Sequence, residues 1–321
     1  MVFPFSPKPP PFTATTLIAR IRTAFREFPD ERRGGNRQRY TVDDAALSAF
    51  SVFFTQSPSF LDYQRRMQRR LGRNNAQSLF GVHQIPSDNQ IRNLLDPVPP
   101  ETLFPVVAEI SEGLYHGGYL QSFRSVFNTL LVAFDGTEYF ASQKLGGDCC
   151  NQRTLSNGAT QHYPVVLTPV IVAPGPAAVV PLAPEFVSPQ DGHDKQDCEL
   201  AAAGRWLARW SARYAPWGIT VLGDDLYSHQ PFCQAIRDQG GHFLFVCRPD
   251  SHPTLYEWVA DFDRLGYVRT VVKTRWTGKE RLIDTYRYVL QAPLRDSDDA
   301  LLVNGCERTT PICTSSAPIR P

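Results

Sequence analysis

The chain has 321 residues, with 33 Lys+Arg against 32 Asp+Glu, 42% hydrophobic and 20% charged residues. This composition is that of an ordinary soluble protein with one large or two average domains. The sequence excludes a membrane-spanning helix, because prolines interrupt the longest apolar stretch, residues 165–183, and a spanning helix needs about 18 or more apolar residues.

The cysteines and the N-terminus predict a cytoplasmic protein. Seven cysteines, an odd number in a chain of this length, do not suggest a disulfide framework. The first residues lack the basic segment and the following apolar segment of a secretory signal.

The charge is unevenly distributed along the chain. Residues 1–100 carry 14 Lys+Arg against 8 Asp+Glu, a net charge of +6, whereas residues 101–321 carry 19 against 24, a net charge of −5. Thirteen of the 14 N-terminal cations are arginine, whose planar guanidinium binds phosphate with two hydrogen bonds. The first part of the chain is therefore predicted to contact nucleic acid, with a solvated arginine-rich surface as the alternative.

The first third of the chain predicts a helical region. Residues 1–16 are rich in proline and threonine and are expected to form a flexible arm. A helix is expected from Leu17 to Phe28, and another after Thr41, which can form a capping box with Asp44. Residues 17–124 are therefore interpreted as an all-helical DNA-binding region.

One predicted helix, residues 60–73, carries most of the positive charge. Apolar residues at steps of three and four form one face, and five arginines occupy the others: Arg65, Arg66, Arg69, Arg70 and Arg73. Like charges this close repel one another unless an anion is near. These arginines are the predicted contacts to double-stranded DNA.

The second part of the chain predicts an α/β fold. Apolar runs indicate strands and amphipathic stretches indicate helices in this order: strands 128–134, 162–173 and 177–182, helix 195–214, strand 219–222, helix 231–238, strand 242–247, helix 253–264, and strands 268–276 and 281–290. The expected organisation is an α/β core over 125–264, a β-rich segment over 265–305, and an irregular tail over 306–321.

Two aspartates follow apolar strands. Asp135 comes after Leu-Leu-Val-Ala-Phe, and Asp224 comes after Ile-Thr-Val-Leu-Gly. If the two strands are neighbours, the carboxylates meet at one edge of the sheet, where a divalent metal such as Mg²⁺ would relieve their repulsion. The alternative is that each aspartate only caps a helix or starts a turn.

The segment Leu-Val-Ala-Phe-Asp-Gly-Thr-Glu-Tyr-Phe at 131–140 resembles the first catalytic block of DDE transposases of bacterial insertion sequences. Gly-Asp-Asp-Leu-Tyr-Ser at 223–228 resembles their second block, and 86–92 and 189–199 are also similar to this group. The resemblance spans about residues 20–305. It implies an RNase H-like mixed sheet with helices, with the catalytic core over 125–264 and the start of a β-rich insertion over 265–305.

The same resemblance implies roles for individual residues. Asp135 and Asp224 become the catalytic carboxylates that bind Mg²⁺ or Mn²⁺, and Asp225 and Glu199 are further candidate ligands. Asp224 is preferred to Asp225 because Tyr227 stands three residues after it. Tyr227 is interpreted either as a DNA-positioning residue or as part of the core.

The segments that resemble this family do not include a counterpart of its third catalytic carboxylate. Transposases of this group carry it on a helix after the β-rich insertion, within a Tyr…Arg…Glu…Lys pattern. No such helix is predicted here, and Glu307 borders an expected strand. We therefore expect a C-terminally truncated transposase with no assigned third DDE carboxylate.

The function implied by the resemblance is binding of the ends of an insertion sequence, followed by Mg²⁺-dependent phosphodiester hydrolysis and strand transfer, impaired by the missing carboxylate. A homodimer on DNA, in the bacterial cytoplasm near the nucleoid and without membrane contact, is expected. The alternatives are a metal-dependent nuclease of the same fold and a catalytically inactive DNA-binding remnant.

Overall fold

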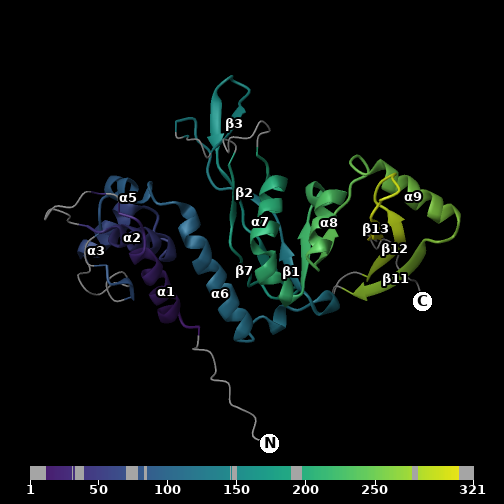
Figure 1. The fold of residues 1–321 in the computed structure, drawn as a ribbon, viewed down its shortest axis with the longest axis horizontal. Helices are drawn as coiled ribbons and strands as arrows, with labels where there is room; N and C mark the ends of the chain where they lie inside the picture. The colour runs from purple at the N-terminus through teal and green to yellow at the C-terminus, as the bar shows by residue number, and fades with distance from the viewer. Residues whose placement is uncertain are drawn as a thin grey trace, which may run out of the picture. The chain divides into compact units, whose positions relative to one another are not determined.

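The computed structural model describes residues 12–30, 32, 40–69, 79–82, 85–144, 146, 150–188, 197–276 and 281–310. The fold is α/β, with helices and several sheets (Figure 1). The chain divides into two compact units, the first comprising Met1–Ser125 and Thr168–Pro184, and the second Val126–Leu167 and Glu185–Pro321.

The first unit is mainly helical. Its helices are α1 (Ala14–Arg26), α2 (Val42–Phe54), α3 (Phe60–Arg69), α5 (Asp88–Leu95) and α6 (Phe104–His116), with short 3₁₀ turns at Pro100–Leu103 and Gln121–Phe123. Helix α1 begins earlier than expected, because Thr13 and Thr16 form a reciprocal capping box. The prediction that residues 1–16 form an arm is therefore wrong from Ala14 onward.

The expected caps of two other helices are confirmed. Thr41 and Asp44 cap each other at the start of α2, and Ser87 accepts a hydrogen bond from the Gln90 backbone at the start of α5. These caps satisfy backbone N–H groups that would otherwise lack partners. The apolar faces then pack together: α1, α2 and the 79–82 segment form one buried cluster, and α2 and α5 form another.

Prolines divide the β structure expected over 162–173. Three separate strands occupy this stretch: β4 (Thr160–Tyr163), β5 (Val165–Leu167) and β6 (Val170–Val172). Pro164 and Pro169 lie between them, where their missing N–H groups end the ladders. Strand β6 pairs antiparallel with β7 (Val180–Pro181) in the first unit.

The second unit is built on three parallel strands. They are β1 (Leu130–Ala133), β9 (Ile219–Gly223) and β10 (His242–Phe245), with β9 between the other two. Helix α7 (Glu199–Tyr214) places an apolar stripe against this sheet, where Trp206 meets Phe134 edge to face. Helix α8 (Gln230–Asp238) connects β9 to β10.

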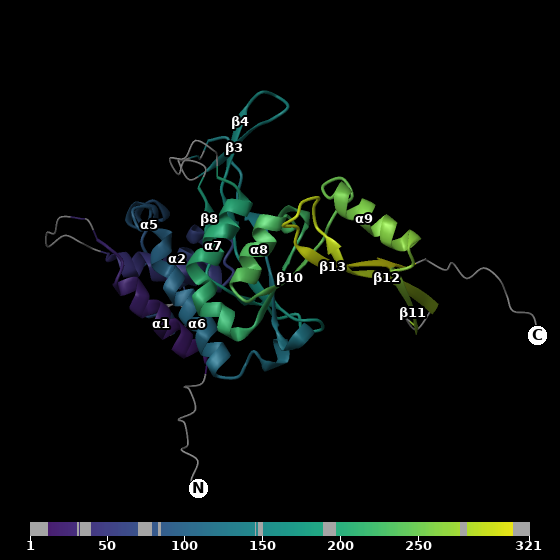
Figure 2. The same ribbon diagram turned by 45° about the vertical axis from the view of Figure 1, so that its right-hand side comes forward.

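A smaller sheet lies beside α7. It contains β2 (Gly136–Glu138), β5 and β8 (Glu185–Val187), and the hairpin of β3 (Asn151–Thr154) and β4 extends from it (Figure 2). Arg205 of α7 donates hydrogen bonds to Glu185 and Asp197, whose side chains are 6% and 0% exposed. This ion cluster fixes the start of α7 against β8.

The last part of the second unit is an antiparallel sheet of β11 (Arg269–Trp276), β12 (Arg281–Pro293) and β13 (Leu302–Thr309). Helix α9 (Pro253–Arg264) packs against β12 (Figure 1). Strand β13 was not predicted, so the expected irregular tail from residue 306 is wrong up to Thr309. The polar sequence of β13 does not by itself indicate a strand, and β13 is stabilised by its pairing with β12.

Candidate functional site

Asp135 and Asp224 lie at the same edge of the parallel sheet. Strands β1 and β9 pair from Leu130 with Ile219 to Ala133 with Leu222. Each aspartate stands two residues beyond the last pair, so the two occupy equivalent positions at the strand ends. Adjacent strands lie about 4.8 Å apart. Both aspartates are exposed, and the expected convergence of the two strand ends is present.

Glu199, the first residue of α7, lies at the same edge. Its Oε1 accepts a hydrogen bond from the backbone N–H of Gly136 (2.8 Å), the residue directly after Asp135. A Cβ atom at position 136 would lie 2.2 Å from Glu199 Oε2, so a larger residue there would force the Glu199 carboxylate to move. The structure therefore brings Glu199 to the first strand end, whereas the sequence offered it only as a further candidate.

Tyr227 connects Glu199 to the second strand end. Its side chain is 1% exposed and packs against Phe134 and Phe232, and its hydroxyl donates a hydrogen bond to Glu199 Oε1. Burial raises the pKa of Tyr227, and the negative charges of Glu199, Asp224 and Asp135 raise it further. The hydroxyl therefore keeps its proton at neutral pH and acts as a donor. Of the two interpretations of Tyr227, core packing agrees with its burial.

The side chain of Asp225 is held by the segment that follows β10, and not by the residues around Glu199. Its carboxylate accepts hydrogen bonds from the Arg248 backbone N–H (2.6 Å) and from the Ser251 hydroxyl. Burial raises the pKa of Asp225, but these hydrogen bonds outweigh it and lower the pKa on balance. Asp224 makes one contact, in which Oδ1 accepts from the Leu226 backbone N–H. Asp224 is thus freer than Asp225 to bind a ligand.

A serine, a histidine and an aspartate meet next to this site, which the sequence did not indicate. Ser228 Oγ lies 2.5 Å from His252 Nε2, and Asp225 Oδ1 lies 3.8 Å from the same nitrogen. A nucleophilic triad needs the acid on the other ring nitrogen. Ser228 is also only 1% exposed. The group is therefore a packing cluster and not a hydrolase triad.

The donor set fits a magnesium ion held by two carboxylates. Within the described residues, no group of three or more His, Cys, Asp or Glu side chains is placed to hold a metal. Mg²⁺, however, commonly takes one or two protein carboxylates, together with waters and substrate phosphate. Asp135 accepts no hydrogen bond from any described residue, and Asp224 keeps Oδ2 free. These two carboxylates are the residues that would hold the ion.

The arginines of α3 belong to the first unit. Arg65, Arg66 and Arg69 are exposed, and Arg66 pairs with Asp62 at 2.7 Å. Arg65 and Arg69 make no ion pair with any described residue. Arg70 and Arg73 lie outside the described residues.

Comparison with known proteins gives no family. No protein-family model matches the chain, and no curated protein matches its sequence. In the part of the chain that the structure describes, no helix is long and apolar enough to cross a bilayer.

The hydrogen bond between Tyr227 and Glu199 is expected to stabilise the second unit. We expect Tyr227→Phe to lower the free energy of unfolding by about 1.5 kcal/mol, because the partly buried Glu199 carboxylate loses one of its two donors. Urea denaturation measures the change. The control is Tyr256→Phe, which removes an exposed hydrogen bond to the Cys247 carbonyl. Equal losses in the two variants would contradict the prediction.

Proposed function

We propose that this chain contains the RNase H-like catalytic core of a DDE-type insertion-sequence transposase. The observation that carries the proposal is the pair of aspartates, Asp135 and Asp224, at equivalent positions after neighbouring parallel strands. Paired carboxylates at a sheet edge are a typical arrangement for metal-dependent phosphodiester chemistry. The resemblance of both aspartate segments to the transposase blocks supports the same conclusion.

The order of elements also supports an RNase H-like core. Strand β1 is followed by short β elements, then by α7, and then by β9, which returns to lie parallel to β1. Helix α8 and β10 continue the parallel sheet on the other side of β9. This order delivers both aspartates to one edge of the sheet and places the first turn of α7 beside them.

The residues of the site have separate tasks in this proposal. A bound Mg²⁺ or Mn²⁺ would supply charge that activates an attacking oxygen and stabilises the leaving one. Asp135 and Asp224 bind and orient the ion. Tyr227 keeps its proton and holds the Glu199 carboxylate in place, and the contacts of Asp225 fix the turn that follows Asp224.

The third carboxylate stays unassigned. Glu307 lies on β13 with a 67% exposed side chain that pairs with Arg287 at 3.5 Å, and not on a helix. Glu199 is the described glutamate that contacts the residue after Asp135. The proposal therefore includes impaired strand transfer and treats Glu199 as the nearest substitute.

A cleavage assay tests this function. The full chain is incubated with the DNA that flanks its own gene, in Mg²⁺ or Mn²⁺, with EDTA as the control. Cut and joined products support a transposase, and cut but unjoined products support the nuclease alternative. If the DNA is bound but never cut with either metal, the enzymatic proposal fails and the DNA-binding remnant is favoured.

DNA binding through α3 is part of the proposal, together with a homodimer on double-stranded DNA and a location at the bacterial nucleoid.

We expect the double variant Arg65→Gln, Arg69→Gln to weaken DNA binding and to reduce the slope of log K against log salt by about 1.8, because each phosphate contact contributes about 0.9. Fluorescence anisotropy over a salt series measures the slope. Arg237→Gln, which changes an exposed arginine of α8, is the control. An unchanged slope in the double variant would place the DNA contact elsewhere.

A further inference from the structure

Glu199 connects the two chain segments that carry Asp135 and Asp224. Its Oε1 accepts two hydrogen bonds, one from the Gly136 backbone N–H (2.8 Å) and one from the Tyr227 hydroxyl. Gly136 directly follows Asp135, and Tyr227 lies three residues after Asp224. A single carboxylate oxygen therefore links the segment after β1 to the turn after β9.

The start of α7 is held in place independently of this link. Asp197, two residues before Glu199, accepts hydrogen bonds from Arg205 and from the Ser188 backbone N–H, each 2.8 Å long. The Asp197 side chain is 0% exposed, and breaking a buried ion pair is costly. The backbone of Glu199 therefore has a fixed position, and the two strand ends are held relative to it.

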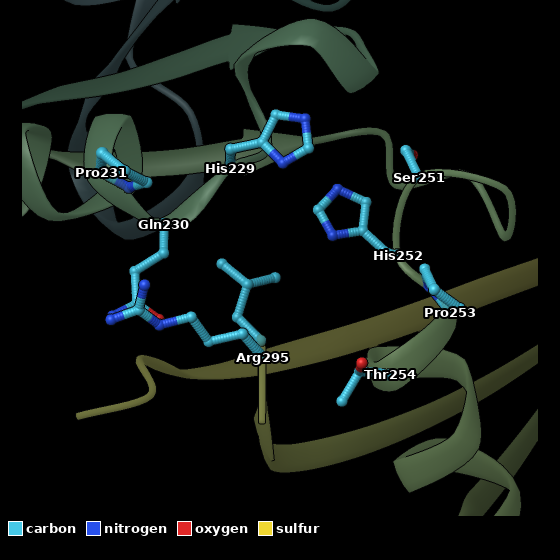
Figure 3. A pocket seen from close by; sticks show the side chains of 9 residues that line it. His229, Gln230, Pro231, Ser251, His252, Pro253, Thr254 and Arg295 are labelled. Atoms are coloured by element: carbon cyan, nitrogen blue, oxygen red, sulfur yellow. The ribbon is translucent and has the colours of Figure 1, made fainter. Parts of the chain in front are cut away.

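The turn that carries Tyr227 is also fixed. The Ser228 hydroxyl donates to the Asp225 carbonyl (2.6 Å) and therefore accepts from His252 Nε2, 2.5 Å away. The ring of His252 stacks on that of His229 with the centroids 5.0 Å apart (Figure 3). Because Tyr227 is itself only 1% exposed, its hydroxyl has little freedom to move away from the carboxylate.

Glu199 is the nearest substitute for the missing third carboxylate, but its contacts give it another task. Oε1 is engaged by two donors, and Oε2 lies against Gly136. Within the described residues, Glu199 does not join Asp135 and Asp224 in a group of three that could hold a metal. Burial and the hydrogen bond to Glu199 raise the pKa of Tyr227, so its hydroxyl stays a donor at neutral pH.

We propose that Glu199 is a positioning residue, which holds the Asp135 and Asp224 strand ends at the spacing that a shared metal ion requires. The inference rests on the proposed function, because the ion gives this spacing its purpose. Two carboxylates at close range repel each other when no cation is bound. A link that does not depend on the ion keeps the strand ends in place until it binds.

Hydrogen exchange of the full chain, without metal, tests the link. We expect Glu199→Ala to speed exchange of the Gly136 amide by about tenfold, because the amide loses its acceptor. Glu199→Gln should restore the protection, because the amide oxygen of glutamine can accept both hydrogen bonds. Glu257→Ala, which changes an exposed glutamate of α9, is the control. Exchange at the wild-type rate in Glu199→Ala would overturn the proposal.

Calorimetric titration with Mn²⁺ separates a positioning residue from a metal ligand. Loss of a residue that orients a ligand costs about 10–100-fold in metal affinity, so we expect Glu199→Ala to bind Mn²⁺ at least about tenfold more weakly. Glu199→Gln should stay within about threefold of the wild type, because the link needs an acceptor and not a charge. If Glu199→Gln loses as much affinity as Glu199→Ala, Glu199 is a ligand and the proposal is wrong.

Tyr227→Phe tests the other half of the link. It removes the contact with the turn after β9 but leaves the hydrogen bond from Gly136. Exchange over residues 224–228 should therefore rise while the Gly136 amide stays protected, and unchanged exchange over 224–228 would contradict the link. If the wild type neither binds Mn²⁺ nor cuts DNA, the proposed function fails, and the exchange rates alone decide whether Glu199 holds the strand ends.

Discussion

Asp135→Asn should reduce metal-dependent DNA cleavage by about a thousandfold, which corresponds to about 4 kcal/mol of transition-state stabilisation. The amide keeps the size of the side chain but removes the negative charge that would attract the metal. Because Asp135 is exposed and accepts no hydrogen bond from the described residues, its replacement should not destabilise the fold. Cleavage rates and DNA affinity are measured on the same preparations.

Two further aspartate variants sharpen this test. Asp224→Asn should match Asp135→Asn, because the two residues occupy equivalent strand-end positions. Asp238→Asn changes a carboxylate at the end of α8 and should cut DNA at the wild-type rate. If Asp135→Asn keeps wild-type activity, or if all three variants lose activity equally, the assignment of the site to Asp135 and Asp224 is wrong.

Replacement of Arg205 by methionine is expected to cost about 3 kcal/mol of unfolding free energy at neutral pH. The variant keeps the length of the side chain but leaves the Asp197 carboxylate, which is 0% exposed, without its main partner. Breaking a buried ion pair typically costs 3–5 kcal/mol. We expect a cost at the lower end of this range because Arg205 itself is 37% exposed and Arg209 still pairs with Glu185.

The pH dependence of this variant should change sign. In the wild type, burial raises the pKa of Asp197, but hydrogen bonds from Arg205 and Ser188 outweigh it and lower the pKa below 3.8. Asp197 therefore contributes stability above about pH 4, which is lost as the pH falls through its folded-state pKa. Without Arg205, burial dominates and raises the pKa. Arg205→Met should then become more stable as the pH falls from 7 toward 5.

Urea denaturation at neutral pH and near pH 5 checks both parts of the Arg205 prediction. Arg237→Met is the matched control, because it changes an exposed arginine near the end of α8. We expect this control to lose less than about 0.5 kcal/mol at either pH. If Arg205→Met loses no more unfolding free energy than this control, the ion cluster contributes little to stability.

Local sequence signals predicted the helices and buried strands well. Helix α9 was predicted at its observed bounds, Pro253–Arg264, because Pro253 marks its first residue and an apolar stripe follows. Strands β1 and β9 were predicted from their short apolar runs. Because both are buried parallel strands, each reads as a continuous apolar segment, and each is followed by one of the two aspartates.

The features that were missed depend on contacts between distant residues. Strands β3 and β13 have polar sequences and are stabilised by their partners in the sheet. The contact between Tyr227 and Glu199 joins residues 28 positions apart, and no local pattern indicates it. The sequence placed Glu199 on an amphipathic helix predicted over 195–214, and the structure places it at the first residue of that helix. Its approach to Gly136 was not visible in the sequence.

The matched register of β1 and β9 has a consequence for insertions and deletions. The connection between the two aspartates includes the β3–β4 hairpin, which can change in length without moving either strand end (Figure 2). A single deletion within 131–134 or 220–223 would instead turn one aspartate to the opposite face of the sheet, because side chains alternate along a strand. The number of residues between the two carboxylates can therefore change without harm to the site, whereas the few residues that lead into each one must keep their number.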